Sequence, residues 1–205
     1  MKFEDRVAKE MTEGMVKAIL EEAGYRVIDS GIEDVIRELS CLSGLEYGLL
    51  RYPKAMTRLP DFTVMNREQT EKFLVEVKYR SQWGKSLIVS VAEQVQLLGE
   101  MVLVSINSAP QTSTNYQFPS TYLRCCRLRY LDGQYDIQLK YEDANGWNHY
   151  WRSVDELMAQ DYPDDKLWWG MSPLEKVFTR LSEDPVDTRR VLFSAIQALS
   201  GILKG

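Results

Sequence analysis

The segment Lys72–Arg80 constrains the fold more than any other, because its side chains alternate with the two-residue period of a β-strand. One face of this strand would carry Phe73, Val75, Val77 and Tyr79, and the other face would carry Lys72, Leu74, Glu76, Lys78 and Arg80. The neighbouring segments are too apolar for a strand that lies free on the surface. A covered sheet face that holds Glu76 and Lys78 side by side therefore needs a physical explanation.

A second predicted strand, Phe62–Met65, precedes the first and pairs with it as a hairpin. A four-residue loop between Asn66 and Glu71 would place Asp61 directly opposite Glu76, with Cβ atoms about 4.5–5.5 Å apart. Two carboxylates this close repel each other unless a positive charge lies between them. A hard cation such as Mg²⁺ accepts carboxylate oxygens, and Lys78 on the same face can orient an attacking water.

The flanking segments predict helices and strands in an order typical of an α/β protein. Gly24 is a natural end for the first helix. In chain order we expect a helix over residues 2–23, a strand over Tyr25–Asp29, a helix over Ile32–Ser43, the two hairpin strands, a helix over Leu87–Leu98 and a buried strand over Met101–Ile106.

The last third of the chain has a different pattern, with hairpin turns followed by two helices. Asp132-Gly133 predicts a tight hairpin between strands over Tyr122–Leu131 and Gln134–Tyr141, and Asn145-Gly146 predicts a second turn into Trp147–Arg152. Two helices are expected after it. The first would begin at the capping box Ser172-Pro173-Leu174-Glu175, and the second at Asp184-Pro185.

The final predicted helix carries an apolar face that must be buried. Its members are Val191, Leu192, Ala195, Ile196, Leu199 and Leu203. Either the core of the same chain or a second copy in a homodimer could cover it. We expect a core over residues 1–110 and a β-hairpin and helical elaboration over 111–205, which can pack together as one domain.

The composition is that of an ordinary globular protein, with 44% hydrophobic and 27% charged residues among 205. No apolar run approaches the length of a membrane span, and the three cysteines do not have the spacing of a disulfide framework or a zinc site. We therefore expect a cytoplasmic protein with no membrane partner. Because the sequence lacks a Gly-rich phosphate loop, we expect no nucleotide triphosphate as a ligand.

The net charge of −5 argues mildly against broad affinity for nucleic acid, but its distribution is uneven. Residues 51–85 hold eight Lys and Arg against four Asp and Glu, which leaves −9 for the rest of the chain. A mixed-charge surface also explains this pattern. If DNA lies across the region, the expected contacts are Arg58, Arg80, Lys85 and Gln94.

The pattern Pro60-Asp61…Glu76-Val77-Lys78 resembles the PD-(D/E)XK nuclease superfamily, whose core order is αβββαβ. The archaeal Holliday-junction resolvases are the most similar type, because they also begin with a glutamate-bearing helix that ends in Gly-aromatic and runs directly into a strand. Here Gly24-Tyr25 occupies that position, and Glu13 matches the helix glutamate by its spacing to the glycine. The resemblance covers roughly residues 5–106 and leaves the C-terminal third without a counterpart.

The resemblance implies a restriction-endonuclease-like fold and Mg²⁺-dependent hydrolysis of DNA, with Mn²⁺ as a substitute metal and products that carry 5′-phosphate and 3′-hydroxyl ends. Asp61, Glu76 and the Val77 carbonyl oxygen would hold the metal, and Lys78 would position the attacking water. Glu13 would help to hold a second metal or a water. Gln94 and Gln96 are similar to a glutamine that some relatives place on the helix after the last catalytic strand.

Several alternatives stay open. Glu76 could form a surface ion pair with Lys78 or Lys72, Glu13 could be a solvated helix residue, and Gln94 and Gln96 are interpreted most simply as exposed. A second acidic-x-Lys match, Asp164-Asp165-Lys166, lies in a predicted loop and illustrates a chance occurrence. The chain could also be a catalytically silent member that binds nucleic acid or protein, or a subunit of a restriction or defence complex. His149 and Cys41 are not expected to form a catalytic pair.

Overall fold

The computed structural model describes residues 3–32, 52–108, 118–143 and 146–203, together with single positions between 36 and 50. Cys41 and almost all of the helix predicted over Ile32–Ser43 lie outside these ranges.

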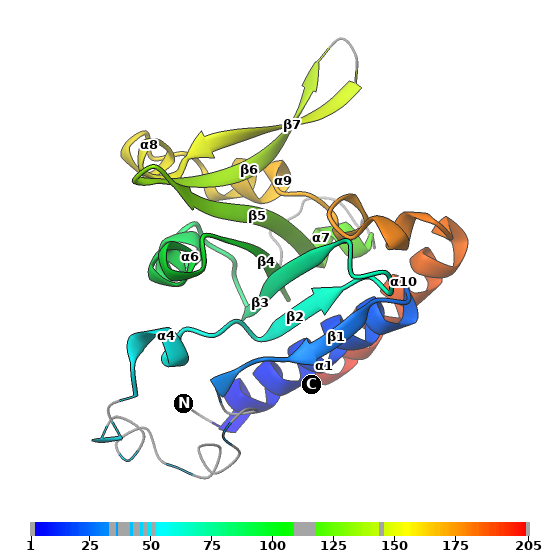
Figure 1. Cartoon of the computed structure of the whole chain (residues 1–205). Coiled ribbons are helices and arrows are strands. Elements are labelled where there is room, and N and C mark those ends of the chain that lie inside the picture. Colours follow the sequence, from blue (N-terminus) through cyan, green and yellow to red (C-terminus); the bar gives the residue numbers. More distant parts are fainter. Residues whose placement is uncertain are drawn as a thin grey trace.

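A mixed sheet of seven strands forms the centre of the described structure, and its strand order is the order along the chain (Figure 1). The strands are β1 (Arg26–Asp29), β2 (Phe62–Met65), β3 (Lys72–Arg80), β4 (Glu100–Asn107), β5 (Leu123–Leu131), β6 (Gln134–Asp143) and β7 (Gly146–Ser153). Neighbours are antiparallel except β3 and β4, which are parallel. Hydrogen bonds between β4 and β5 carry the sheet across the boundary that we placed at residue 110.

The first half of the chain runs helix, three antiparallel strands, helices, and a strand parallel to the third. The helix α1 (Phe3–Glu22) precedes β1, and the short α4 (Lys54–Thr57) lies between β1 and β2. A parallel pair needs a crossover, which α5 (Ser86–Ser90) and α6 (Ala92–Leu98) provide between β3 and β4. We predicted one helix here. The structure divides it at Val91, whose φ and ψ of −101° and 2° leave the helical region.

The register of the β2–β3 hairpin agrees with the prediction from loop length. Phe62 pairs with Val75 and Met65 pairs with Lys72, so the preceding position, Asp61, faces Glu76. The turn is held by the Asn66 side chain, whose Oδ1 accepts a hydrogen bond from the Glu71 N–H at 3.1 Å. The alternation of β3 is also confirmed, because Val75 and Val77 pack on one side of the sheet and Leu74 on the other.

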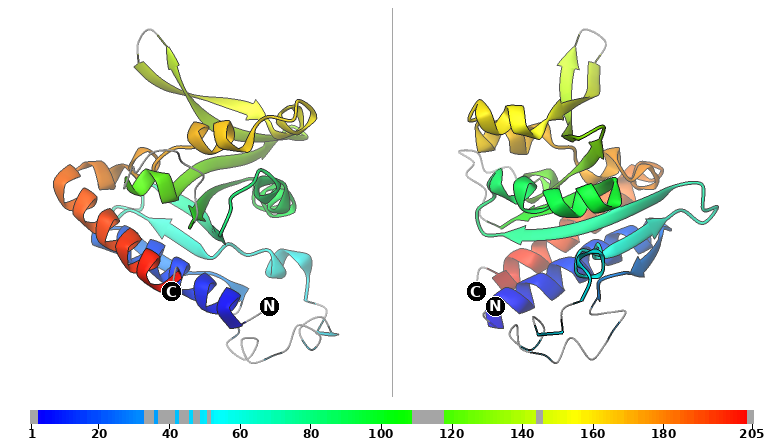
Figure 2. Two further views of the ribbon diagram at one scale, coloured as in Figure 1. Left: turned by 180° about the vertical axis from the view of Figure 1, so that it is seen from behind. Right: turned by 60° about the vertical axis from the view of Figure 1, so that its left-hand side comes forward.

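Helices cover both faces of the sheet (Figure 2). On one face lie α1 and α10 (Pro185–Leu203), and on the other lie α5, α6, α8 (Val154–Ala159) and α9 (Asp164–Gly170). Leu192, Ile196 and Leu199 of α10 are buried in the core of the same chain, which was one of the two expected ways to cover its apolar face. No helix among the described residues has both the length and the apolar character needed to cross a bilayer.

The capping-box prediction at Ser172 is wrong. The chain forms only two 3-10 turns there, η2 (Leu174–Lys176) and η3 (Thr179–Ser182). Ser172 exchanges two backbone hydrogen bonds of 2.8 Å with Cys125, and its hydroxyl lies 3.0 Å from His149 Nε2. These contacts hold Ser172 as an extended residue, so its side chain does not cap a helix.

Two further elements differ from the sequence prediction. Asp164, Asp165 and Lys166 belong to the helix α9 instead of a loop, and α8 was not predicted. A short helix, α7 (Pro119–Tyr122), leads into β5. The hairpin at Asp132-Gly133 is confirmed, with Leu131 paired to Gln134.

Candidate active site

Asp61 connects the start of β2 to the middle of β3. Its backbone carbonyl accepts a hydrogen bond from the Ser30 N–H at 3.0 Å, which attaches it to the end of β1. Its side-chain Oδ2 accepts a hydrogen bond from the Val77 N–H at 2.7 Å. The carboxylate is therefore held against the strand that carries Glu76 and Lys78.

Glu76 is buried, with 6% of its surface exposed, although it is charged. Its Oε1 forms an ion pair with Lys78 Nζ, and its Oε2 accepts a hydrogen bond from Gln94 Nε2 at 2.8 Å. Both oxygens thus have a donor, as a buried carboxylate requires. The contact with Lys78 was one of the alternatives from the sequence, but the pair is partly buried and does not lie on an open surface.

Gln94 is a buried residue of α6, so its interpretation as an exposed glutamine is wrong. Besides Glu76, its Nε2 approaches the Leu59 carbonyl oxygen at 3.3 Å, and the side chain thereby links the helix to the chain that enters β2. Gln96, on the opposite side of the helix, is exposed. Gln94 follows the buried Val91 by three residues, so it lies on the apolar stripe of the helix. This position is the sequence signal that could have predicted its burial.

Glu13 of α1 faces the same group of side chains. The pKa of its carboxyl is raised from 4.5 to about 8, first by burial and then by the negative charge of Asp61, against the opposing effects of Lys9 and Lys78. Among the described residues its Oε1 is buried without a hydrogen-bond partner, although Lys9 Nζ lies 3.7 Å away. Glu13 is therefore not a freely solvated helix residue.

The pKa of the Asp61 carboxyl is raised as well. Burial and then the charge of Glu76 raise its pKa from 3.8 to about 6, against the opposing effects of Lys78 and the Val77 N–H. Glu13, Asp61 and Glu76 thus act on one another electrostatically, with Lys78 as the cation that contacts Glu76 directly. Such a group becomes more stable when it gains a proton or a cation.

The predicted DNA contacts are mostly occupied by side chains of the protein. Arg58 donates to Glu93 at 2.7 Å, and Lys85 pairs with Asp161 and donates to the Tyr162 carbonyl at 3.1 Å. Arg80 is exposed at the end of β3 and donates to the neighbouring Tyr79 carbonyl at 2.7 Å. Of these three, Arg80 is the one without a carboxylate partner in the described structure.

Among the described residues, no three His, Cys, Asp or Glu side chains are grouped closely enough to hold a metal ion together. The Val77 N–H contacts Asp61, whereas the metal-binding role of the Val77 carbonyl stays a prediction. His149 contacts Ser172 instead of a cysteine. Comparisons with models of protein families, with curated proteins and with solved structures find no match.

Proposed function

We propose that the protein is a Mg²⁺-dependent nuclease that hydrolyses phosphodiester bonds in DNA, as in the PD-(D/E)XK superfamily that its motif resembles. The observation that carries the proposal is the placement of Asp61 beside the Glu76–Lys78 pair on adjacent strands. The order helix, three strands, helix, strand around this pair supports it. We also propose that these elements form the core of a restriction-endonuclease-like fold.

The donor set is suited to a hard cation. Asp61 and Glu76 are the side chains that would hold Mg²⁺, which commonly uses one or two carboxylates, waters and substrate phosphate. The raised pKa values of Glu13 and Asp61 support this fit, because burial and then the neighbouring carboxylates disfavour their charged forms, and a bound cation would offset that repulsion. When bound, the metal would supply Lewis-acid stabilisation of charge on the phosphate.

Two side chains would act at the scissile phosphate, and a third would act on Glu76. Lys78, which is 26% exposed, would donate a hydrogen bond that positions the attacking water and would stabilise charge in the transition state. Glu13 would help to hold that water or a second metal; its pKa of about 8 keeps the carboxyl largely protonated at neutral pH as long as no cation is bound. Gln94 would act through Glu76, whose orientation it sets.

The test is cleavage of plasmid, single-stranded and branched DNA in Mg²⁺ or Mn²⁺, compared with the same reactions in EDTA. Asp61→Asn and Lys78→Gln should lose at least about a hundredfold in rate, since groups of this kind typically contribute that much or more. Asn keeps an acceptor for the Val77 N–H, and therefore the fold should persist.

The matched controls are Asp164→Asn and Lys166→Gln, which change the second acidic-x-Lys match on α9 and should leave cleavage unchanged. Mn²⁺ binding by titration calorimetry gives an independent measurement, and Asp61→Asn should weaken it. Full cleavage by both Asp61→Asn and Lys78→Gln would refute the catalytic assignment.

A second candidate is a catalytically silent protein of the same fold, alone or as a subunit of a restriction or defence complex. It is favoured by the contacts of Glu76, whose two oxygens already have Lys78 and Gln94 as partners. Under this alternative, no DNA substrate is cleaved in either metal and Mn²⁺ does not bind.

A further inference from the structure

The β6–β7 hairpin extends beyond the rest of the sheet as a two-stranded ribbon (Figure 1). β6 pairs with β5 only from Gln134 to Ile137, and after that point Ser172 takes the place beside Cys125. We call the part of the hairpin from Gln138 to Asp143 and from Gly146 to Trp151 the ribbon. Its two strands pair with each other; at its base Leu139 is buried against the body, and the opposite face of the ribbon carries Lys140 and His149.

One face of the ribbon combines aromatic and basic side chains, and we call it the lysine face. The register pairs Lys140 with His149, Glu142 with Trp147 and Gln138 with Trp151, and such pairs share a face. Trp147 is 61% exposed, and Lys140 Nζ lies 4.7 Å from its ring centroid. The lysine face therefore presents an exposed aromatic ring and a cation side by side.

A polar recess of about 480 Å³ lies at the base of the lysine face. Its lining includes Gln138 and His149 of the ribbon, Lys72 at the start of β3, Arg127 of β5 and Lys176 of η2. Lys176 and Lys140 both lower the pKa of His149, after the larger effect of burial, which places these cations around one imidazole.

The basic residues here are incompletely neutralised. Within the described part of the chain, Lys72, Lys140 and Lys176 have no carboxylate within ion-pair distance. Arg127 is the exception, since it pairs with Glu100. Glu71 is the carboxylate that lines the recess, so basic groups outnumber acidic ones there. The excess charge is complementary to a polyanion.

We propose that the lysine face and the recess at its base bind single-stranded nucleic acid. Exposed aromatic side chains stack on unpaired bases, and neighbouring cations neutralise the backbone phosphates. Trp147 would supply the stacking surface, while Lys140, Lys176 and Lys72 would contact phosphates. A duplex keeps its base faces stacked inside, so the tryptophan favours an unpaired strand.

This surface is separate from the candidate active site. Lys72 precedes Glu76 by four residues on β3, which corresponds to about 13 Å along the strand. The binding proposal therefore does not rest on cleavage. It can be tested in EDTA, which removes divalent cations and so prevents metal-dependent cleavage.

The experiment is fluorescence anisotropy of labelled oligothymidylate, oligouridylate and a duplex of equal length, titrated with the full chain in EDTA. Wild type should bind the single strands more tightly than the duplex, and the DNA and RNA arms identify which single strand is preferred. Trp147→Ala should weaken single-strand binding about tenfold, the usual size of one stacking contact. Lys140→Ala with Lys176→Ala should lower the dependence of log affinity on log salt by about 0.7 for each lost phosphate contact.

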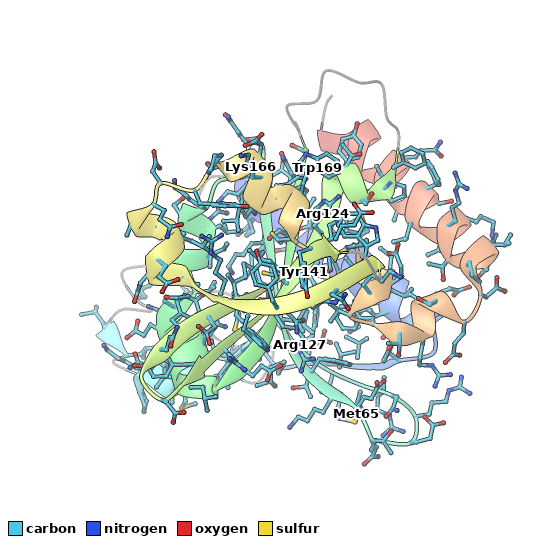
Figure 3. The ribbon with its side chains drawn as sticks, turned by 90° about the horizontal axis from the view of Figure 1, so that it is seen from above. Met65, Arg124, Arg127, Tyr141, Lys166 and Trp169 are labelled. Carbon is cyan, nitrogen blue, oxygen red and sulfur yellow. The ribbon has the colours of Figure 1, made fainter. Side chains whose placement is uncertain are left out.

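Two control variants lie on the other side of the ribbon. Tyr150→Ala removes an aromatic ring of β7 that is 36% exposed and points away from the lysine face, and Lys166→Ala removes an exposed lysine of α9. Figure 3 shows Lys166 and Arg127 on opposite sides of β7. Neither control should change single-strand binding.

Unchanged affinity in both Trp147→Ala and the double lysine variant would overturn the proposal, as would equal losses in the controls. Light scattering adds a third decisive outcome. If wild type is a dimer that Trp147→Ala converts to a monomer with unchanged nucleic-acid binding, the lysine face belongs to a second copy and the proposal fails. Loss of cleavage in Asp61→Asn with normal binding would concern the active site alone.

Discussion

The replacement Glu13→Gln tests whether burial, together with the nearby carboxylates, disfavours the ionised form of Glu13 in the folded protein. Glutamine has nearly the shape of the protonated acid but cannot ionise. The pKa of Glu13 rises from 4.5 to about 8 in the folded protein, so between these values the folded state keeps a proton that the unfolded chain has lost. The stability contributed by Glu13 is therefore present below about pH 4.5 and is lost as the pH rises through about 8.

The magnitude follows from the width of that interval. A difference of one in pKa corresponds to about 1.4 kcal/mol, so the interval from 4.5 to about 8 would correspond to about 4.8 kcal/mol for a fully enclosed group. The side chain of Glu13 is 20% exposed and lies near Lys9, and solvent screening reduces the effect. We expect the free energy of unfolding of Glu13→Gln to exceed that of wild type by about 2 kcal/mol at about pH 9 and by almost nothing at about pH 5.

The assay is urea unfolding of wild type and variant at both pH values, in EDTA so that no divalent cation contributes. Glu10→Gln, on the exposed side of the same helix, is the control for loss of a helix charge and should follow wild type at both pH values. Parallel pH dependence of Glu13→Gln and wild type would refute the reasoning, because the carboxyl would then be solvated in the folded state.

Three other substitutions probe the framework around the site. Gln94→Ala removes the donor to Glu76 Oε2 and should cost about 1.5–3 kcal/mol in the free energy of urea unfolding; unchanged stability would show that Glu76 is satisfied without Gln94. Gly24→Ala and Gly99→Ala place a side chain at φ of 81° and 84°, and each should lower stability by about 1–2 kcal/mol. A Cβ at Gly24 would lie 3.4 Å from the Arg180 guanidinium and a Cβ at Gly99 would meet no atom within 4 Å, so the backbone conformation is the common cause; unchanged thermal melts of both variants would contradict this account.

Local rules predicted much of the fold. The two-residue alternation of β3 and the length of the loop after Asn66 were sufficient to predict the register that sets Asp61 opposite Glu76. Asp132-Gly133 predicted the β5–β6 turn, and Asp184-Pro185 predicted the start of α10. These features depend on neighbours in the chain, where turn geometry and side-chain period act directly.

Pairings between distant segments were not predictable in the same way. Ser172 has the sequence of a helix cap, yet its backbone bonds to Cys125 and its hydroxyl contacts His149. Gln94 was interpreted from the sequence as an exposed helix residue, yet its side chain donates a hydrogen bond to Glu76. In each case a hydrogen bond to a remote segment outweighs a local preference that is worth about 1 kcal/mol.

The sequence by itself therefore determined the hairpin that aligns the two carboxylates, because pleat and turn length leave one register that keeps the apolar face inside. The tertiary structure decided which charges are neutralised. It encloses Glu13, gives Glu76 a second donor from α6, pairs Lys85 with Asp161, and leaves Lys140 beside an exposed tryptophan. Burial and charge pairing depend on segments far apart in the chain, and these meet only when the sheet and its two helical layers are assembled.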